Sequence, residues 1–240
     1  MKYLIAMTLC LLLGSPAFAT STIPLDKAVM NIFELGIKTG KSQQYDEVAR
    51  SNISSSVRNE SGTLAMYSLK RKDDLNQAYM IEIYANEEAY KKHLDSEPYQ
   101  AFVAQAPEII EQKRKKDVVP QFLGDKRITQ TEKTINNLVI VDVKPSYQQA
   151  FKNIVLPEMA ESLRVEDGVL AMYAATDAKD ENRWYFYEIY ASEADYQLHR
   201  ETPHFRAYIE QTAEMTTGKE SIPVVPVFLR NKGKLASSDR

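Results

Sequence analysis

The chain has 240 residues, with 30 Lys and Arg against 33 Asp and Glu, and a net charge of −3. This mildly acidic balance gives no electrostatic reason to expect nucleic acid as a partner. The single cysteine, Cys10, falls in the N-terminal segment, which excludes disulfides, thiolate nucleophiles and cysteine-ligated metals from the remainder. A hydrophobic core must therefore stabilise the protein, and a chain of about 200 residues is long enough to form one.

Residues 1–19 have the pattern of a secretory signal peptide. Lys2 supplies a positive start, Tyr3–Leu13 form an apolar run, and Ala-Phe-Ala then presents small residues to a signal peptidase. The apolar run is too short to span a bilayer. We therefore expect cleavage near Ala19, a mature protein without a membrane span, and a periplasmic or secreted location.

The rest of the chain is a tandem repeat of two similar units. Short segments recur at a constant separation of 106 residues. They are GTLAMY and GVLAMY at Gly62 and Gly168, EIYA at Glu82 and Glu188, and VVPQFL and VVPVFL at Val118 and Val224. About a third of the positions are identical between 31–126 and 137–232. We predict two domains, at 28–126 and 135–232, with a linker at 127–134 and a polar C-terminal tail at 233–240.

Each unit is predicted to have the order β-α-β-β-α-β, which is that of the ferredoxin-like fold. In the first unit, NIFELGIK at 31–38 has the composition of a strand, and the helix after it places Tyr45, Asn52 and Val57 on one face. GTLAMYSLK and QAYMIEIYA then form a strand pair, a helical region follows, and VVPQFL closes the unit. The basic run Lys113–Lys116 is expected to end that helical region, because cations suit the carbonyl end of a helix dipole.

In the second unit, Pro157 is expected to kink or interrupt the first helix. Ser192 can cap a helix that ends near His199, and Thr202 can cap another that begins just before His204. The break between these two helices is predicted to turn both histidine side chains toward one corner of the unit.

The strand WYFYEIY in the second unit holds a carboxylate among bulky side chains. Strand alternation places Trp184, Phe186, Glu188 and Tyr190 on one face and Tyr185, Tyr187 and Ile189 on the other. Both faces are therefore expected to be covered, and Glu82 has the equivalent position in the first unit. Burial raises the pKa of a carboxyl group, which would tune Glu82 and Glu188 for general acid–base catalysis. The structural alternative is that each glutamate bonds backbone amides or an arginine across the domain interface.

The histidines also allow two interpretations. As functional residues, His199 and His204 would shuttle protons at the entrance of a pocket, with Glu188 as their partner. As structural residues, they would lie at helix ends, one satisfying terminal carbonyls and the other simply exposed to solvent. The two are five positions apart in sequence, whereas helical ligand pairs are normally three or four apart, so no metal site with Glu188 is predicted.

The segment YFYEIYASEADYQLHRETPHFRAY resembles the antibiotic biosynthesis monooxygenase domain, in which a strand ending in Glu-x-Tyr is followed by a histidine and then by Thr-Pro-His and an aromatic residue. The similarity extends over both units. It implies an α+β protein in which two ferredoxin-like domains form a dimeric α+β barrel, each closing strand reaching over its neighbour. Because both domains lie on one chain, we expect this barrel to be intramolecular. Short sheets with one apolar face give an independent reason for such pairing.

The resemblance also implies a function. Some members of the family are cofactor-free monooxygenases of quinols and phenols, in which the substrate loses a proton and then reacts with oxygen. Carried over by position, the expected catalytic residues are His199, His204 and Glu188, and the expected substrate-binding residues are Tyr190, Trp184, Phe205, His93 and Glu82. Pro98 replaces the second histidine in the first unit, which implies that this unit has lost or altered its activity.

We therefore expect a small aromatic or phenolic substrate and no cofactor. The alternatives are a non-catalytic module that binds a small ligand or acts as a scaffold, and an isomerase of an enolisable molecule. A buried pocket with His199, His204 and Glu188 would favour an enzyme, whereas an interior filled by side chains would favour a module. The sequence leaves open the identity of the substrate and whether copies of the chain form a homo-oligomer.

Overall fold

The computed structural model describes residues 21–233 and 235–238, so the predicted signal peptide lies outside the described residues. The helices are α1 (Ser42–Asn59), α2 (Glu87–Leu94), α3 (Glu97–Ile109), α4 (Gln148–Val165), α5 (Glu193–Glu201) and α6 (Pro203–Thr212), with a 3-10 turn η1 (Pro145–Tyr147). The strands are β1 (Ser21–Pro24), β2 (Val29–Ile37), β3 (Thr63–Arg71), β4 (Gln77–Tyr84), β5 (Ile110–Asp125), β6 (Ile135–Val143), β7 (Val169–Asp177), β8 (Arg183–Tyr190), β9 (Thr216–Ile222), β10 (Val224–Asn231) and β11 (Leu235–Ser238).

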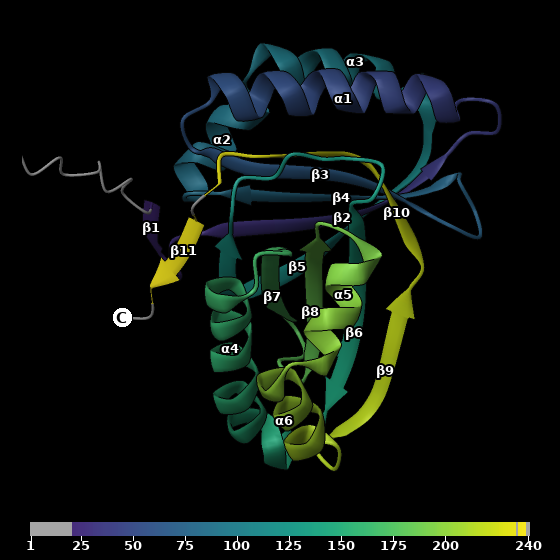
Figure 1. Cartoon of the computed structure of the whole chain (residues 1–240). Helices are drawn as coiled ribbons and strands as arrows, with labels where there is room; N and C mark the ends of the chain where they lie inside the picture. The colour runs from purple at the N-terminus through teal and green to yellow at the C-terminus, as the bar shows by residue number, and fades with distance from the viewer. Residues whose placement is uncertain (1–20, 234, 239–240) are drawn as a thin grey trace, which may run out of the picture.

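The two units have the predicted order of elements and pack against each other through their sheets (Figure 1). Each contributes a first strand, a long helix, a strand pair, a pair of shorter helices and a closing strand. The long helices α1 and α4 cover the outer faces of their sheets together with α3 and α6 (Figure 1). The sheet order β10-β3-β4-β2-β5-β7-β8-β6-β9 joins both units into one structure.

The closing strands are exchanged between the units. β5 pairs with β2 of its own unit from Ile110 to Asp117 and with β7 of the other unit from Val118 to Asp125. Likewise, β9 pairs with β6 of its own unit, and β10 pairs with β3 of the first unit. These pairings confirm the predicted intramolecular dimeric barrel built from two ferredoxin-like domains.

The prediction that Lys113–Lys116 end a helix is wrong, since these residues lie within β5. Continuous backbone pairing with β2 holds them extended, and their charges are accommodated along the strand. Arg114 and Lys116 each lie 3.3 Å from a carboxylate oxygen of Glu34, and the Lys113 ammonium lies 4.9 Å from the centre of the Phe33 ring.

Side chains fill the interior of the barrel. Tyr185, Tyr187 and Ile189 of β8 point inward, as the strand alternation predicts. The hydroxyls of Tyr67 and Tyr173, from opposite units, lie 2.8 Å apart, and that of Tyr173 donates a 2.6 Å hydrogen bond to Asp125. The other face of β8 packs beneath the helices. The pockets lined by Glu188 and by Glu82 lie outside the barrel centre, between the sheet and the helices.

Of the two outcomes expected at Pro157, a kink or an interruption, the interruption does not occur, because α4 is continuous from Gln148 to Val165. Phe151, Val155 and Met159 are buried against the sheet on both sides of the proline, and this packing holds the helix together despite the lost backbone donor. β11, within the predicted polar tail, pairs with β1, and its Leu235 is buried. Within the described residues, no helix combines the length and the apolar composition needed to cross a bilayer.

Candidate functional site

A pocket of about 580 Å³ lies in the second unit, between the outer face of the sheet and the helices α4, α5 and α6. Its walls combine polar and charged residues with apolar and aromatic ones, among them Met159, Phe186, Phe205 and Tyr208. Two carboxyl groups, Glu158 from α4 and Glu188 from β8, line the same space. Arg200, Glu201, Arg206, Glu210 and Lys219 complete a charged rim.

Glu158 is the residue that sequence reasoning missed. Glu158 is only 6% exposed, and the Ser162 hydroxyl donates a 2.8 Å hydrogen bond to Glu158 Oε1. Burial raises the pKa of Glu158 to about 8, and the negative charges of Glu188 and Glu166 add to the effect. The repeat contained a usable signal, because Glu158 aligns with Asn52, which was predicted to lie on the sheet-facing side of its helix.

Glu188 lies on the floor of the pocket, held by two donors. The Tyr190 hydroxyl donates a 2.9 Å hydrogen bond to Glu188 Oε2, and the Asn137 amide nitrogen lies 3.5 Å from the same oxygen. The two carboxyls of this pocket therefore differ in environment, one being buried and proton-binding and the other bonded as an acceptor. Pairs of titratable groups with such unlike surroundings are characteristic of acid–base sites.

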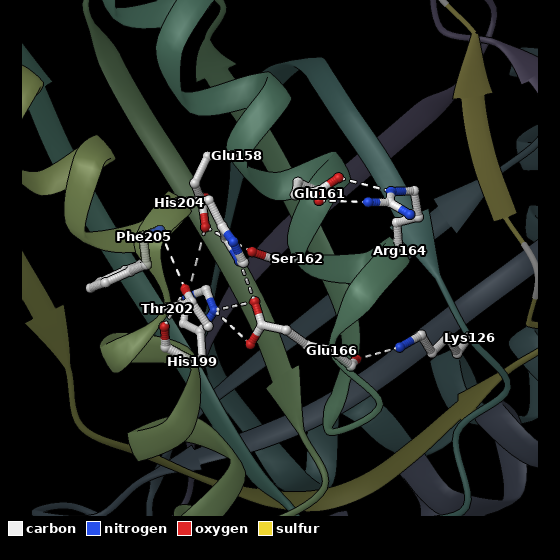
Figure 2. Close-up of polar contacts among 10 residues, drawn as sticks. All are labelled: Lys126, Glu158, Glu161, Ser162, Arg164, Glu166, His199, Thr202, His204 and Phe205. Carbon is white, nitrogen blue, oxygen red and sulfur yellow. Dashed lines mark hydrogen bonds and ion pairs between the residues drawn. The ribbon is translucent and has the colours of Figure 1, made fainter.

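The histidines meet at one corner, as predicted. Thr202 lies between α5 and α6, and its hydroxyl accepts from the Phe205 amide, so that His199 ends one helix and His204 begins the next. Their common partner is Glu166, in the loop after α4, and not Glu188 (Figure 2). His199 Nδ1 lies 3.1 Å from Glu166 Oε1, and His204 Nε2 lies 2.6 Å from the same atom.

Both histidines stand behind the pocket wall. Neither is among the residues that line the pocket, and His199 Nε2 lies 4.0 Å from Glu158 Oε1. Partial burial alone would raise the pKa of Glu166, but the hydrogen bonds with His204 and His199 outweigh it and lower that pKa. Glu166 is therefore an ionised carboxylate between two imidazoles.

The expected substrate-binding residues fall in different places. Phe205 lines the pocket, whereas Trp184 and Tyr190 are buried in the core beneath the helices, Tyr190 orienting Glu188. In the first unit, Glu82 lines a separate pocket of about 360 Å³, and His93 is buried, its Nδ1 3.0 Å from Glu60. Burial also raises the pKa of Glu82.

Two residue differences near the pocket distinguish the first unit from the second. Asn52 stands where the second unit has Glu158, and Pro98 stands where it has His204. The pocket of the first unit therefore keeps Glu82, the counterpart of Glu188, and lacks a counterpart of Glu158. That the first unit has lost or altered its activity stays a prediction.

A set of groups that could hold a divalent cation also includes Glu158. Glu158, His199 and His204 each offer a ligand atom, and these atoms lie within 4.8 Å of one another. Two histidines and one carboxylate are a familiar ligand set for transition metals. The carboxylate in this set is Glu158, whereas the set considered from sequence contained Glu188.

Known proteins share this architecture. Two solved structures, each described as a "putative monooxygenase", superpose on nearly the whole chain. The one from Lactobacillus acidophilus is 28% identical with a TM-score of 0.82, covering 86% of this chain and 97% of its own. The one from Fusobacterium nucleatum is 26% identical with a TM-score of 0.83, covering 89% and 98%. An anthrone oxidase-like protein, 15% identical with a TM-score of 0.55, covers 90% of this chain and 99% of its own and shares the fold.

The family model named antibiotic biosynthesis monooxygenase matches the chain twice, at residues 28–105 and 135–211. The two matches fall one in each structural unit and together cover more than half of the chain. The protein therefore belongs to the antibiotic biosynthesis monooxygenase family, as a tandem duplicate.

Proposed function

We propose that the second unit is a cofactor-independent monooxygenase of a quinol or another phenolic small molecule. The observation that supports this most is the presence of Glu158 and Glu188 in one pocket that apolar and aromatic side chains also line. Glu158, with a pKa raised to about 8, is matched to removing the proton of a phenol near neutral pH. Glu188 accepts a hydrogen bond from the substrate or orients it.

The reaction balances without another redox partner. The substrate O–H bond breaks, Glu158 takes the proton, and the electron-rich ring anion transfers electrons to molecular oxygen. One oxygen atom forms a new bond to a ring carbon, whose C–H bond breaks with loss of a proton. The other oxygen atom leaves as water with two of the three protons that the substrate gives up, and the third stays on the new hydroxyl. A hydroquinone is thus converted by one O₂ into a hydroxyquinone and one water, with all four electrons supplied by the substrate.

The charged residues at the rim of the pocket indicate which substituents a substrate could carry. Arg206 is paired with Glu201, whereas Arg200 lies over the Tyr196 ring at 5.8 Å. Together with Lys219, Arg200 gives the entrance a cationic side. We therefore include in the substrate class hydroquinones that bear a carboxylate substituent.

Oxygen uptake by the protein with a panel of hydroquinones, with and without a carboxylate, tests the proposal. We expect Glu158→Gln to lower kcat/KM by about 10²–10⁴-fold, the usual contribution of a general base. Glu161→Gln, an exposed position of the same helix, is the control and keeps the wild-type rate. Uptake no faster than uncatalysed oxidation, or equal uptake by wild type and Glu158→Gln, would refute the proposal.

An isomerase of an enolisable molecule is the second candidate. The same observation favours it, because a carboxyl pair can remove a proton from one carbon and return it to another. Product analysis distinguishes the two, since isomerisation consumes no oxygen. A binding module is the alternative that the side-chain-filled barrel interior favours, and it would bind the hydroquinone and release it unchanged.

We also propose that the protein is exported. The support is the signal-peptide pattern of residues 1–19. The intact mass of the protein isolated from the envelope or the medium of the cells that produce it tests this, and a chain that retains Met1–Ala19 would contradict it.

A further inference from the structure

The pocket of the first unit, of about 360 Å³, has no role in the oxidation proposed for the second unit. It lies between the sheet and the helices α1, α2 and α3, in the place that the larger pocket has in the second unit. The two pockets match position by position, because equivalent residues are 106 apart in the sequence. The residues that differ between them therefore indicate what each pocket can bind.

Asn52 offers the first pocket a hydrogen-bond donor where the second pocket has the carboxyl group of Glu158. Asn52 is only 4% exposed, and the Ser56 hydroxyl donates a 3.2 Å hydrogen bond to its side-chain oxygen. Among the contacts of the described residues, the side-chain nitrogen of Asn52 has no protein partner. An N–H group that loses water when a ligand binds needs a new acceptor. The ligand atom at this position should therefore be an acceptor, such as a carbonyl oxygen.

Glu82 provides a second polar contact on the sheet side of the same pocket. The Tyr84 hydroxyl donates a 2.9 Å hydrogen bond to Glu82 Oε2, and the Asn31 amide nitrogen lies 3.4 Å from the same oxygen. Both of these donors use Oε2, so Oε1 is the oxygen that a ligand can reach. Burial raises the pKa of Glu82, which favours the protonated carboxyl, a hydrogen-bond donor. Both polar groups of the pocket thus suit acceptor atoms on a ligand.

The rim of the first pocket carries fewer charges than that of the second. Leu94 lines the first pocket at the position that Arg200 has in the second. The charges that line this rim, Glu111 and Lys113, are opposite in sign. Aromatic rings form much of the walls, namely those of Phe33, Tyr90, Tyr99 and Phe102. Such walls fit a flat, uncharged molecule, because aromatic rings bury a large apolar area against one another.

We propose that the pocket of the first unit binds an uncharged quinone, with a ring carbonyl that accepts a hydrogen bond from the Asn52 side chain. A phenol suits the second pocket because its carboxyl groups accept hydrogen bonds, whereas a quinone suits the first because its oxygens only accept them. The inference goes beyond the oxidation proposed for the second unit and does not depend on it, since binding requires neither proton transfer nor oxygen. The two units of one chain thus bind rings of opposite hydrogen-bonding character.

Isothermal titration calorimetry of the protein with menadione, an uncharged naphthoquinone, tests the proposal. Asn52→Leu removes the donor, and Asn52→Asp replaces it by an acceptor, so each should weaken menadione binding by about tenfold or more. Naphthoquinone sulfonate, which carries a negative charge, should bind to the wild type about tenfold more weakly than menadione. Asn52→Leu should keep the wild-type rate of oxygen uptake with hydroquinone, because Asn52 lies in the other unit.

Tyr99→Ala and Phe205→Ala are the matched pair of variants, because they remove equivalent rings from the first and second pockets. Only Tyr99→Ala should weaken menadione binding. In the wild type, the infrared carbonyl band of bound menadione should lie below that of menadione in an apolar solvent, because a hydrogen bond weakens the C=O bond.

No binding by the wild type, an unshifted carbonyl band, or equal affinity in the wild type and both Asn52 variants would each overturn the proposal. Binding that Phe205→Ala weakens and Tyr99→Ala does not, or equal affinity for the sulfonate, would do the same. Menadione binding without any oxidation of hydroquinone would refute the function proposed for the second unit and leave this one standing.

Discussion

Replacing Glu158 by glutamine should change how the stability of the protein depends on pH. The pKa of this carboxyl is raised from 4.5 to about 8, so the folded state binds the proton more tightly than the unfolded state. A raised folded-state pKa contributes stability that is complete below pH 4.5 and is lost as the pH rises through about 8. At about 1.4 kcal/mol per pH unit, the full contribution is about 5 kcal/mol.

Between pH 6 and pH 9, the free energy of unfolding loses most of the contribution of Glu158 that remains at pH 6, which is about 3 kcal/mol. Glutamine keeps the size of the side chain and its contact with Ser162 but does not titrate. We therefore expect the free energy of unfolding of the wild type to fall by about 3 kcal/mol more than that of Glu158→Gln over this range, measured by urea denaturation. Glu161→Gln, which is exposed on the same helix, should behave like the wild type. An equal fall in wild type and Glu158→Gln would refute the assignment of a buried, protonated carboxyl.

Three further predictions concern activity and the barrel core. Glu188→Gln removes a negative charge that raises the pKa of Glu158, so the rising limb of the plot of kcat/KM against pH should move to lower pH. A limb that stays in place would contradict the coupling of the two carboxyls. EDTA should leave the rate of hydroquinone oxidation unchanged. A loss of this rate that an added divalent metal reverses would show that Glu158, His199 and His204 hold a cation. Tyr173→Phe removes the donor to buried Asp125 and should lower the free energy of unfolding by about 1–3 kcal/mol, with an unchanged urea midpoint counting against this role.

The fold could be predicted because the chain repeats itself. A constant spacing between matched segments defines two units, and strand alternation in WYFYEIY correctly places Tyr187 and Trp184 on opposite covered faces. The structure shows that the Tyr187 face lies in the barrel and the Trp184 face beneath the helices. The errors occurred where tertiary contacts outweigh local preference. Strand pairing keeps Lys113–Lys116 extended, and packing on both sides of Pro157 preserves its helix.

The candidate site was less predictable because its carboxyls come from segments far apart in sequence. The helix break at Thr202 correctly predicted that both histidines share a corner, but nothing local indicated that Glu166 is their partner. The first unit has a glutamate, Glu60, at the position equivalent to Glu166. This repetition was the sequence signal that could have pointed to Glu166. Glu158 differs between the units, so only its alignment with a buried helix position could have singled it out.

The location of a bound substrate tests the central claim most directly. A crystal structure of the protein grown anaerobically with a hydroquinone should show the ring in the pocket of the second unit. One hydroxyl should lie within hydrogen-bond distance of the Glu158 carboxyl, about 2.6–3.2 Å. A ring found only in the pocket of the first unit, or one whose hydroxyls point away from Glu158 toward the rim, would contradict the account.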